Sequence, residues 1–432
     1  MADSANKRKM RDERRLLVDQ AKTTNINCLP PEIVEEILAL LPIESIHRFR
    51  SVSKSCSSLL ASAEFNKLRR KSTPPPEMIN VVPKFLYHAS SSPSRFVLLS
   101  YYPDAGKEFV ETKESYPIHK FERKNLNHGP FVGSCNGLVC LEHKSVVNDR
   151  SKPEMVVWNP FTGSCRKLPD PPKSWTIDWR YAHGFGHDSA SDDYKVFIAR
   201  CPDPGNDGVR VDIFSLKAGS WKEVENPARE LRHLTGGKSV GLFLNGALHW
   251  ESIKTDGSTK IMAFDLAKEK FYDVSLPQLS NHHQLSPPNY GYNSMGVVGE
   301  YLCVCFLATD ERQRPTDIDL WVMKEYCNEA SWVHFVSYGP HHGTGDVITY
   351  VPNSIPRSAK DGGYLMLQHC TGRFDVLKWI NNNPDEGSDE AEEQYSKKIK
   401  FYWRHIDNMT ATPYTEALTS PFASTGIDQG FA

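Results

Sequence analysis

Apolar residues recur with helical spacing in one short region near the start of the sequence. The positions that mark one face of this region are Ile33, Ile37, Leu40 and Leu41. Their spacing is the period of an amphipathic α-helix. Pro30 and Pro31 suit the first turn, where a missing N–H leaves no hydrogen bond unmade. Pro42 ends the helix, because the residue before a proline avoids the α region.

Two further short helices are predicted directly after the first. Their apolar positions are Ile43, Ile46 and Phe49 in one, and Leu59 and Leu60 in the other. Ser53 precedes the last helix in the position of an N-cap residue. Three short helices cannot bury all of this apolar surface among themselves. Either the rest of the chain or a partner must therefore cover it.

From about residue 78 the pattern changes to the alternation of β-strands, interrupted by tight turns. Asn136-Gly137 and Asn245-Gly246 each separate two apolar runs, the second joining Val240–Leu244 to Ala247–Glu251. Asn-Gly is the strongest short hairpin signal, because both central residues need a positive φ. Hairpins of this kind recur about every 50–60 residues, which is the period of propeller blades. The pattern predicts an all-β propeller of about six four-stranded blades over residues 78–406.

The composition fits a chain with one small and one large domain. Of its 432 residues, 39% are hydrophobic and 11% are aromatic, which is enough to bury a sizeable core. With a net charge of −2, the chain has no overall electrostatic attraction to nucleic acid or to an anionic membrane. The longest apolar run, Tyr301–Ala308, is far too short to span a bilayer. We therefore expect neither a nucleic-acid nor a membrane partner.

The ten cysteines are scattered without a framework, which is typical of free thiols in a reducing compartment. The charged residues Met1 to Arg15 lack the apolar segment of a secretory signal. Both observations predict a protein of the nucleus and cytoplasm. Cys303 and Cys305 lie two apart in a strand-like run and share one face, where a buried apolar pair is favoured over a redox or metal site.

Four segments have the composition of arms, linkers or solvated loops. Residues 1–27 are polar and basic, which predicts a disordered arm, with a nuclear import signal as the alternative. Residues 71–77 contain Ser-Thr-Pro-Pro-Pro and predict a linker. The acidic residues 383–396 predict a disordered loop between the last two strands, with a patch for a basic partner as the alternative. Residues 407–432 are predicted to form a C-terminal tail.

The sequence offers little support for an enzyme. It has no P-loop and no Cys-x-x-Cys pair. The pattern Gly-x-Ser-x-Gly occurs once, at residues 237–241, but a nucleophile elbow also needs a strand before it and a helix after it, and the pattern here is followed by a predicted strand. His282-His283 and His341-His342 are adjacent histidines in polar segments, which is more typical of exposed side chains than of metal ligands. His183 and His187 share a strand face with Phe185, so we expect them to be packed or hydrogen-bonded. We predict no catalytic residue, no metal site and no cofactor.

The helical region resembles an F-box domain. The matching residues are Leu29-Pro30-Pro31-Glu32, Ile37-Leu38, Leu41-Pro42-Ile43-Glu44-Ser45-Ile46, Phe49-Arg50-Ser51-Val52-Ser53-Lys54, Leu59 and Phe65. In that family the first helix and the following loop dock on a Skp adaptor, which links the receptor to a cullin and a RING subunit. The resemblance implies an F-box over residues 28–70. It also implies an adaptor face formed or supported by Leu29, Pro30, Glu32, Ile33, Ile37, Leu41, Pro42, Ile43 and Ile46. Cys56 departs from the family, which often has Trp there, and this reduces packing within the module without removing the docking helix.

The strand-rich region resembles the F-box-associated, kelch-like domains of plant F-box proteins. The matching residues are Gly133-Ser134-Cys135-Asn136-Gly137-Leu138, Trp158-Asn159-Pro160, Gly184-Phe185-Gly186-His187-Asp188, Asp193-Tyr194-Lys195-Val196, Leu244-Asn245-Gly246-Ala247-Leu248-His249-Trp250 and Trp321-Val322-Met323. Together the two resemblances imply a non-catalytic substrate receptor of a Skp–cullin–F-box (SCF) ubiquitin ligase, which promotes ubiquitination and proteasomal degradation of a protein held by the propeller. The alternative is a kelch-like scaffold or inhibitor that binds a partner without degrading it.

The loop lengths predict where a protein substrate binds. In a blade whose strands run up and down, the loops between second and third strands share one face. Here those loops are long, at residues 143–154, 201–208, 252–259 and 309–317, and long loops on a rigid scaffold commonly carry recognition. The predicted substrate-binding residues at their tips are Asp203, Asn206, Lys254, Asp256, Glu311 and Arg312. The alternative is that these loops vary because nothing constrains them.

Overall fold

The computed structural model describes residues 29–41, 43–62, 64–65, 68–69, 84–89, 96–101, 109–114, 131–147, 150–171, 181–200, 209–225, 238–253, 259–278, 290–298, 301–310, 312, 315–338, 351–354, 363–368, 374–379, 400–404, 409–414, 417 and 419–422. The chain divides into two compact units, Met1–Thr73 and Pro74–Ala432. The arm 1–27 and the acidic segment 383–396 lie outside the described residues. No helix among the described residues is long and apolar enough to cross a membrane.

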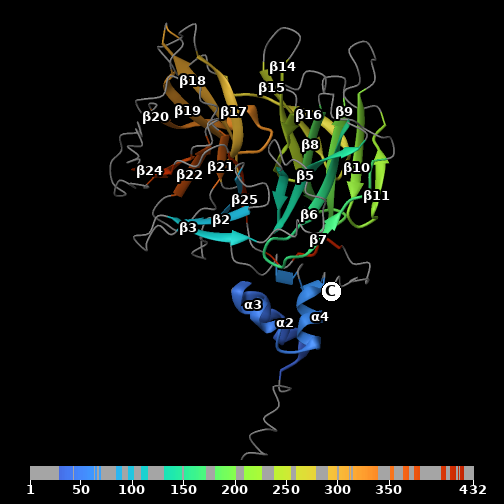
Figure 1. Cartoon of the computed structure of the whole chain (residues 1–432). Helices are drawn as coiled ribbons and strands as arrows, with labels where there is room; N and C mark the ends of the chain where they lie inside the picture. The colour runs from blue at the N-terminus through green and yellow to red at the C-terminus, as the bar shows by residue number, and fades with distance from the viewer. Residues whose placement is uncertain are drawn as a thin grey trace, which may run out of the picture. The chain divides into compact units, whose positions relative to one another are not determined.

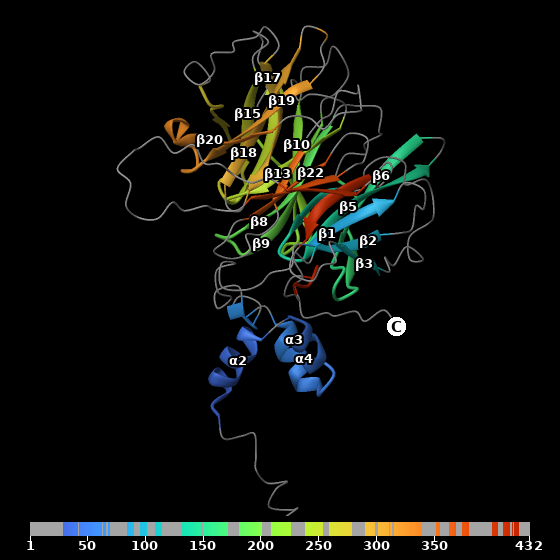
Figure 2. The ribbon, with the colours of Figure 1, turned by 90° about the vertical axis from the view of Figure 1, so that its left-hand side faces the viewer.

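The first unit contains the predicted helices (Figures 1 and 2). They are α2 (Pro31–Leu40), α3 (Ile43–Phe49) and α4 (Lys54–Ala61). Helix α2 starts on Pro31 and ends before Pro42, as the sequence predicts. The Oγ of Ser53 accepts a hydrogen bond from the Cys56 N–H at 3.0 Å, which confirms Ser53 as the N-cap of α4. The side chains buried in this unit include Ala39, Ile46, Leu60 and Phe65.

The described part of the second unit forms six sheets (Figure 1). The first contains β1 (Lys84–Ala89), β2 (Phe96–Tyr101), β3 (Phe109–Glu114) and β25 (Met409–Tyr414), in the order β25-β1-β2-β3. The second contains β4 (Phe131–Cys135), β5 (Leu138–Val147), β6 (Arg150–Trp158) and β7 (Cys165–Lys167). The third contains β8 (Tyr181–Asp188), β9 (Asp193–Arg200), β10 (Arg210–Ser215), β11 (Ser220–Glu223) and β12 (Lys238–Val240).

Three more sheets follow in chain order. The fourth contains β13 (Leu242–Leu244), β14 (Ala247–Ile253), β15 (Thr259–Asp265) and β16 (Lys270–Val274). The fifth contains β17 (Tyr290–Val298), β18 (Tyr301–Thr309), β19 (Pro315–Met323) and β20 (Trp332–Tyr338). The sixth contains β21 (Val351–Ser354), β22 (Gly363–Gln368), β23 (Phe374–Trp379) and β24 (Lys400–Arg404). Neighbouring sheets meet along one strand of each, since β4 contacts β8 and β25, and β21 contacts β17 and β25. This is the arrangement of a β-propeller.

The predicted hairpin turns are confirmed by the backbone. Asn136 and Gly137 have φ values of 48° and 81°, and Asn245 and Gly246 have 49° and 75°. Both residues of each turn thus adopt the left-handed conformation that Asn and Gly tolerate best. In each case the turn joins the first two strands of a sheet.

The end of the ring differs from the prediction for residues 407–432. Strand β24 completes its own sheet by pairing with β23. Residues 409–414, which the composition assigns to a tail, form β25 and pair antiparallel with β1, with Leu86 opposite Thr412. The end of the chain therefore supplies the fourth strand of the first sheet. Pairing partners this far apart in sequence leave no local signal.

Two further details differ from the predicted strands. The run 240–244 is split at Gly241, so that β12 pairs parallel with β8 and β13 begins the next sheet. A Cβ at Gly241 would lie 2.6 Å from the Trp250 ring, so only glycine allows the backbone to pass there. The predicted loop 143–154 is mostly strand, because β5 and β6 continue their ladder to Val147 opposite Arg150. Backbone pairing there extends past the apolar alternation on which the prediction rested.

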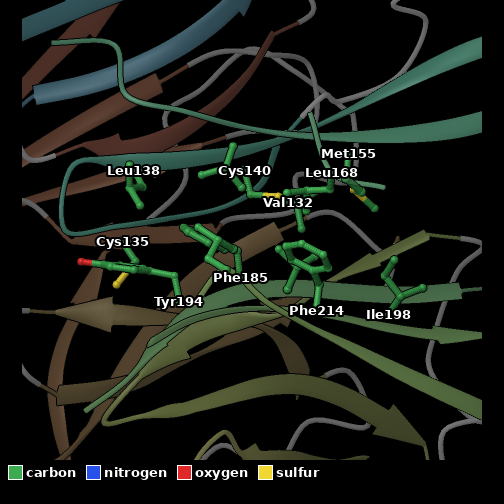
Figure 3. Close-up of a cluster of buried hydrophobic side chains, with 13 residues drawn as sticks. Val132, Cys135, Leu138, Cys140, Met155, Leu168, Phe185, Tyr194, Ile198 and Phe214 are labelled. Carbon is green, nitrogen blue, oxygen red and sulfur yellow. The ribbon is translucent and has the colours of Figure 1, made fainter. Parts of the chain in front are cut away.

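Buried side chains fill the spaces between successive sheets. Cys140 of β5 and Phe185 of β8 belong to one cluster between the second and third sheets (Figure 3). Between the third and fourth, the Phe197 ring centroid lies 4.8 Å from that of Trp250 and 4.9 Å from that of Phe264. The third sheet thus has buried side chains on both faces. A fully buried large apolar side chain contributes about 1.5–3 kcal/mol relative to an exposed one.

Candidate functional site

A stripe of large apolar side chains on α2 and the residue just before it faces away from the helical core. The exposed fractions are 48% for Leu29, 40% for Ile33, 48% for Ile37 and 62% for Leu40. These positions follow the spacing that places residues on one face of a helix. The buried side chain of α2 is the small Ala39. The helix therefore presents its bulkier apolar face outward.

Two further exposed apolar residues lie at the end of α3 and just after it. Phe49 is 41% exposed and Val52 is 68% exposed. With the α2 stripe they make the helical unit rich in solvent-facing apolar surface, the usual mark of a protein-binding face. An apolar stripe at these spacings is how a helix docks in a partner's groove. Sequence reasoning placed Leu40 and Phe49 in helices and Val52 among the residues that match the F-box, but it assigned none of the three to the adaptor face.

The predicted adaptor residues differ in how the structure places them. Those that are exposed are Leu29, Pro30, Glu32, Ile33 and Ile37. Leu41 and Ile43 are half-buried, and Pro42 lies outside the described residues. Ile46 is fully buried, so it packs inside the helical unit and supports the stripe without being part of it.

Arg69 caps the C-terminal end of α2. The last turn of this helix holds no basic residue, and Leu41 after it is extended. The Nη1 of Arg69 donates hydrogen bonds to the Ala39 carbonyl at 2.9 Å and the Leu41 carbonyl at 2.7 Å. The guanidinium satisfies carbonyls that a helix end leaves unpaired, and it sits at the negative end of the helix dipole. It thereby fixes the turn that follows Leu40.

In the sheet unit, Arg312 is the predicted substrate-binding residue that the structure describes. It is exposed, and its backbone N–H donates to Asp310 Oδ1 at 2.8 Å. The other five predicted residues, Asp203, Asn206, Lys254, Asp256 and Glu311, lie outside the described residues. The antiparallel order of the strands puts the β9–β10, β14–β15 and β18–β19 connections at the same end of their sheets, opposite the tight turns.

The histidines predicted to be packed or hydrogen-bonded are so in the structure. His183 is fully buried, with its Nδ1 3.6 Å from Glu142 Oε2. His187 Nε2 lies 3.0 Å from Asp192 Oδ1, and its ring centroid is 4.7 Å from that of Tyr194. His183 thus lies against the second sheet, and His187 packs within the β8–β9 hairpin of the third.

The buried side chains of His249 and Cys305 are held in their neutral forms. Burial lowers the pKa of His249 to about 4, against the opposing effect of hydrogen bonds to backbone groups. Burial also raises the pKa of Cys305 to about 12, and both Cys303 and Cys305 are fully buried, as the apolar-pair prediction requires. Among the described residues, no group of three or more His, Cys, Asp or Glu could hold a metal ion.

Two family models match the chain. The F-box associated beta propeller domain matches residues 91–356, which is more than half of the chain, and the F-box domain matches residues 26–68. The F-box/kelch-repeat protein At3g23880 of Arabidopsis thaliana is 26% identical over 319 residues, covering 72% of this chain and 79% of that protein. The F-box protein CPR1 of the same plant is 26% identical over 379 residues, covering 82% of this chain and 80% of that protein. The chain belongs to the family of proteins that join an F-box domain to an F-box associated β-propeller domain.

Proposed function

We propose that this protein is a substrate receptor of an SCF-type ubiquitin ligase. The observation that carries the proposal is the exposed apolar stripe of α2 in a unit that matches the F-box domain. An F-box implies binding to a Skp-type adaptor, and through it to a cullin and a RING subunit. The receptor needs no bond-making residue, because holding the target near the ubiquitin carrier raises its effective concentration.

The target-binding part of the proposal concerns the sheet unit. The six described sheets correspond to six blades, and the strand pair β25–β1 closes the ring. A protein target binds at the end that carries the longer loops, where Arg312 is exposed. The protein works in the nucleus and cytoplasm, in keeping with its scattered cysteines. Target ubiquitination and proteasomal degradation then follow.

The adaptor contact is tested with Ile33→Asp combined with Ile37→Asp. Both side chains are exposed, so the module should still fold, whereas each charge would be buried unpaired in an apolar contact. We expect binding to a recombinant Skp-type adaptor to fall below detection in a pull-down. Val333→Asp, at an exposed apolar position of β20, is the matched control and should bind normally. Undiminished binding by the folded double variant would contradict the assignment of the α2 stripe as the adaptor-binding face.

Target half-life separates the receptor from a scaffold or inhibitor. Proximity labelling supplies candidate targets, whose half-lives are then compared in cells that express the native chain or the Ile33→Asp, Ile37→Asp variant. A receptor shortens the half-life of its target only when the adaptor face is intact. Targets that bind both chains but turn over equally would favour the scaffold.

The target face is tested by paired substitutions at opposite ends of the sheets. Arg312→Ala changes the loop end, and Lys217→Ala changes a tight turn between β10 and β11. Both side chains are exposed, so neither change should affect folding by more than about 0.5 kcal/mol. We expect target co-precipitation to fall for Arg312→Ala alone. Loss of the target only in Lys217→Ala would assign the other face.

A further inference from the structure

The segment after β25 lies on the turns of the second sheet, to which it is remote in sequence. Ala417 is half-buried, and Thr419 and Pro421 are buried. Their carbonyl groups bond to side chains of the second sheet. This segment is therefore held in a different way from β25, whose strand pairs with β1.

Asn159 provides the main contact and uses its whole hydrogen-bonding capacity. Its side chain is fully buried. The Nδ2 group donates to the Ala417 carbonyl at 2.8 Å and to the Thr419 carbonyl at 2.7 Å. The Oδ1 atom accepts from the N–H groups of Phe161 at 2.9 Å and Thr162 at 3.1 Å. One half of the amide thus binds the segment, and the other half shapes the turn that carries Asn159.

The bound segment bends around this amide. The carbonyl oxygens of Ala417 and Thr419 both bond to the Asn159 Nδ2 atom. They therefore lie closer together than residues two apart in a straight strand, which are separated by about 6.7 Å. Further along, Arg166 Nη1 lies 3.4 Å from the Pro421 carbonyl and donates to the Leu216 carbonyl at 2.8 Å. The guanidinium carbon of Arg166 is 5.6 Å from the centroid of the Phe214 ring. Arg166 therefore connects the bound segment to the third sheet.

Gly137 sets the size of the residue that can lie above it. It has a φ of +81°, and a Cβ at this position would lie 2.5 Å from the Ala417 Cβ and 2.8 Å from the Ala417 nitrogen. Glycine at 137 and a small residue at 417 are both needed for this approach. The second sheet thus recognises the segment by its main-chain carbonyls and by one small side chain.

We propose that Gly137, Asn159 and Arg166 form a peptide-binding site whose ligand is a bent main-chain segment with a small residue at its first bound position. The described residues Ala417 and 419–422 of the same chain occupy this site. Because β25 ends at Tyr414, close before them in the sequence, occupancy of the site also secures the seam between β25 and β1. The site adjoins this seam, since the Tyr414 hydroxyl accepts a hydrogen bond from the Phe161 N–H at 3.2 Å.

The test uses the full chain with a protease recognition sequence inserted between Thr415 and Glu416 and cut after purification. The freed C-terminal fragment should co-elute with the rest of the protein in gel filtration. In Asn159→Asp the carboxylate still accepts from Phe161 and Thr162, but it turns an oxygen instead of a donor toward the two carbonyls. We expect the fragment to bind at least about 10-fold more weakly to this variant, since it loses two buried hydrogen bonds.

A second variant changes the ligand and leaves the site intact. Ala417→Phe cannot lie over Gly137, so the fragment should be released while the near-ultraviolet dichroism of the protein stays unchanged. Asn328→Asp is the matched control, because Asn328 shapes a different turn through its bonds to Glu325 and Ala330. It should retain the fragment. Loss of the fragment from the unsubstituted cut chain, or equal retention by Asn159→Asp and Ala417→Phe, overturns the proposal.

Discussion

In the helical unit, the exposed large apolar side chains are Leu29, Ile33, Ile37, Leu40, Phe49 and Val52, whereas in the described part of the sheet unit they are Val240 and Val333. The sheet unit is much the larger, yet its described residues include fewer exposed large apolar side chains. A sheet that lies between two others, such as the third, has both of its faces covered. Helix α2 has a neighbour on one side, and its bulkier face is the other one.

The contrast shows where each unit can bind a partner. The helical unit has an apolar surface ready for a protein groove, and its binding energy can come from burial. In the described part of the sheet unit, most large apolar side chains lie in its own core. The target recognition proposed for this unit would therefore rely on polar loop residues such as Arg312, whose contacts give specificity more than burial energy.

The largest expected effect compares Trp250→Ala with Ile37→Ala. Trp250 is 1% exposed and packs on Phe197, so its truncation should lower the free energy of unfolding by about 3–5 kcal/mol. Ile37 is 48% exposed, so its truncation should change stability by less than about 1 kcal/mol while weakening adaptor binding. Urea unfolding and adaptor titration measure the two quantities. A stability loss for Ile37→Ala as large as that for Trp250→Ala would remove the contrast.

An acid-sensitive loss of stability is expected in the sheet unit. The pKa of buried His249 is about 4, below its value of about 6.5 in an unfolded chain. Its contribution is therefore complete above pH 6.5 and is lost as the pH falls from 6.5 towards 4, by about 3 kcal/mol. In His249→Gln this loss should be absent. Urea unfolding of both proteins at pH 7 and pH 4.5 measures the loss. An equal decrease in the free energy of unfolding for the two proteins would contradict the prediction.

The partners of His249 make the expected loss specific. Its Nδ1 lies 3.1 Å from the Leu242 carbonyl, and its Nε2 lies 2.6 Å from the Tyr326 hydroxyl. That hydroxyl is 2.5 Å from the one of Tyr272. In the neutral ring, Nδ1 donates to the Leu242 carbonyl and Nε2 accepts from the Tyr326 hydroxyl. When both ring nitrogens carry a proton, Tyr326 loses this acceptor. Tyr326→Phe is thus expected to reduce the acid sensitivity without abolishing it.

The smallest expected effect comes from the cap on α2. Arg69→Ala leaves the Ala39 and Leu41 carbonyls without their donor, which should cost about 1–2 kcal/mol in adaptor binding by loosening the turn after Leu40. Arg69→Lys should restore part of the loss, because the charge at the helix end remains. Arg48→Ala, which removes a bond to Ser45 only three residues away, is the matched control. Equal binding by all three variants would show that the cap does not position the stripe.

Local patterns were sufficient to predict many of the elements. The limits of α2 follow from Pro31 and Pro42, and the hairpins at Asn136-Gly137 and Asn245-Gly246 follow from the positive φ that these residues adopt. The helical spacing also predicts that three short helices cannot bury all of their apolar surface, so that either the rest of the chain or a partner covers it. Such signals are readable because the residues that cause the structure are neighbours in the sequence.

Tertiary contacts decided the rest. Ile46 and Ile37 are both apolar residues on short helices, yet one is fully buried and the other is 48% exposed, because helix packing chooses which face is covered. Asn159 marks a family motif in the sequence, but its role depends on a carbonyl 258 residues away. Strand β25 likewise becomes a strand only because β1 offers it an edge. A chain determines its helices and turns over a few residues, whereas the closure of its ring depends on which distant segments meet.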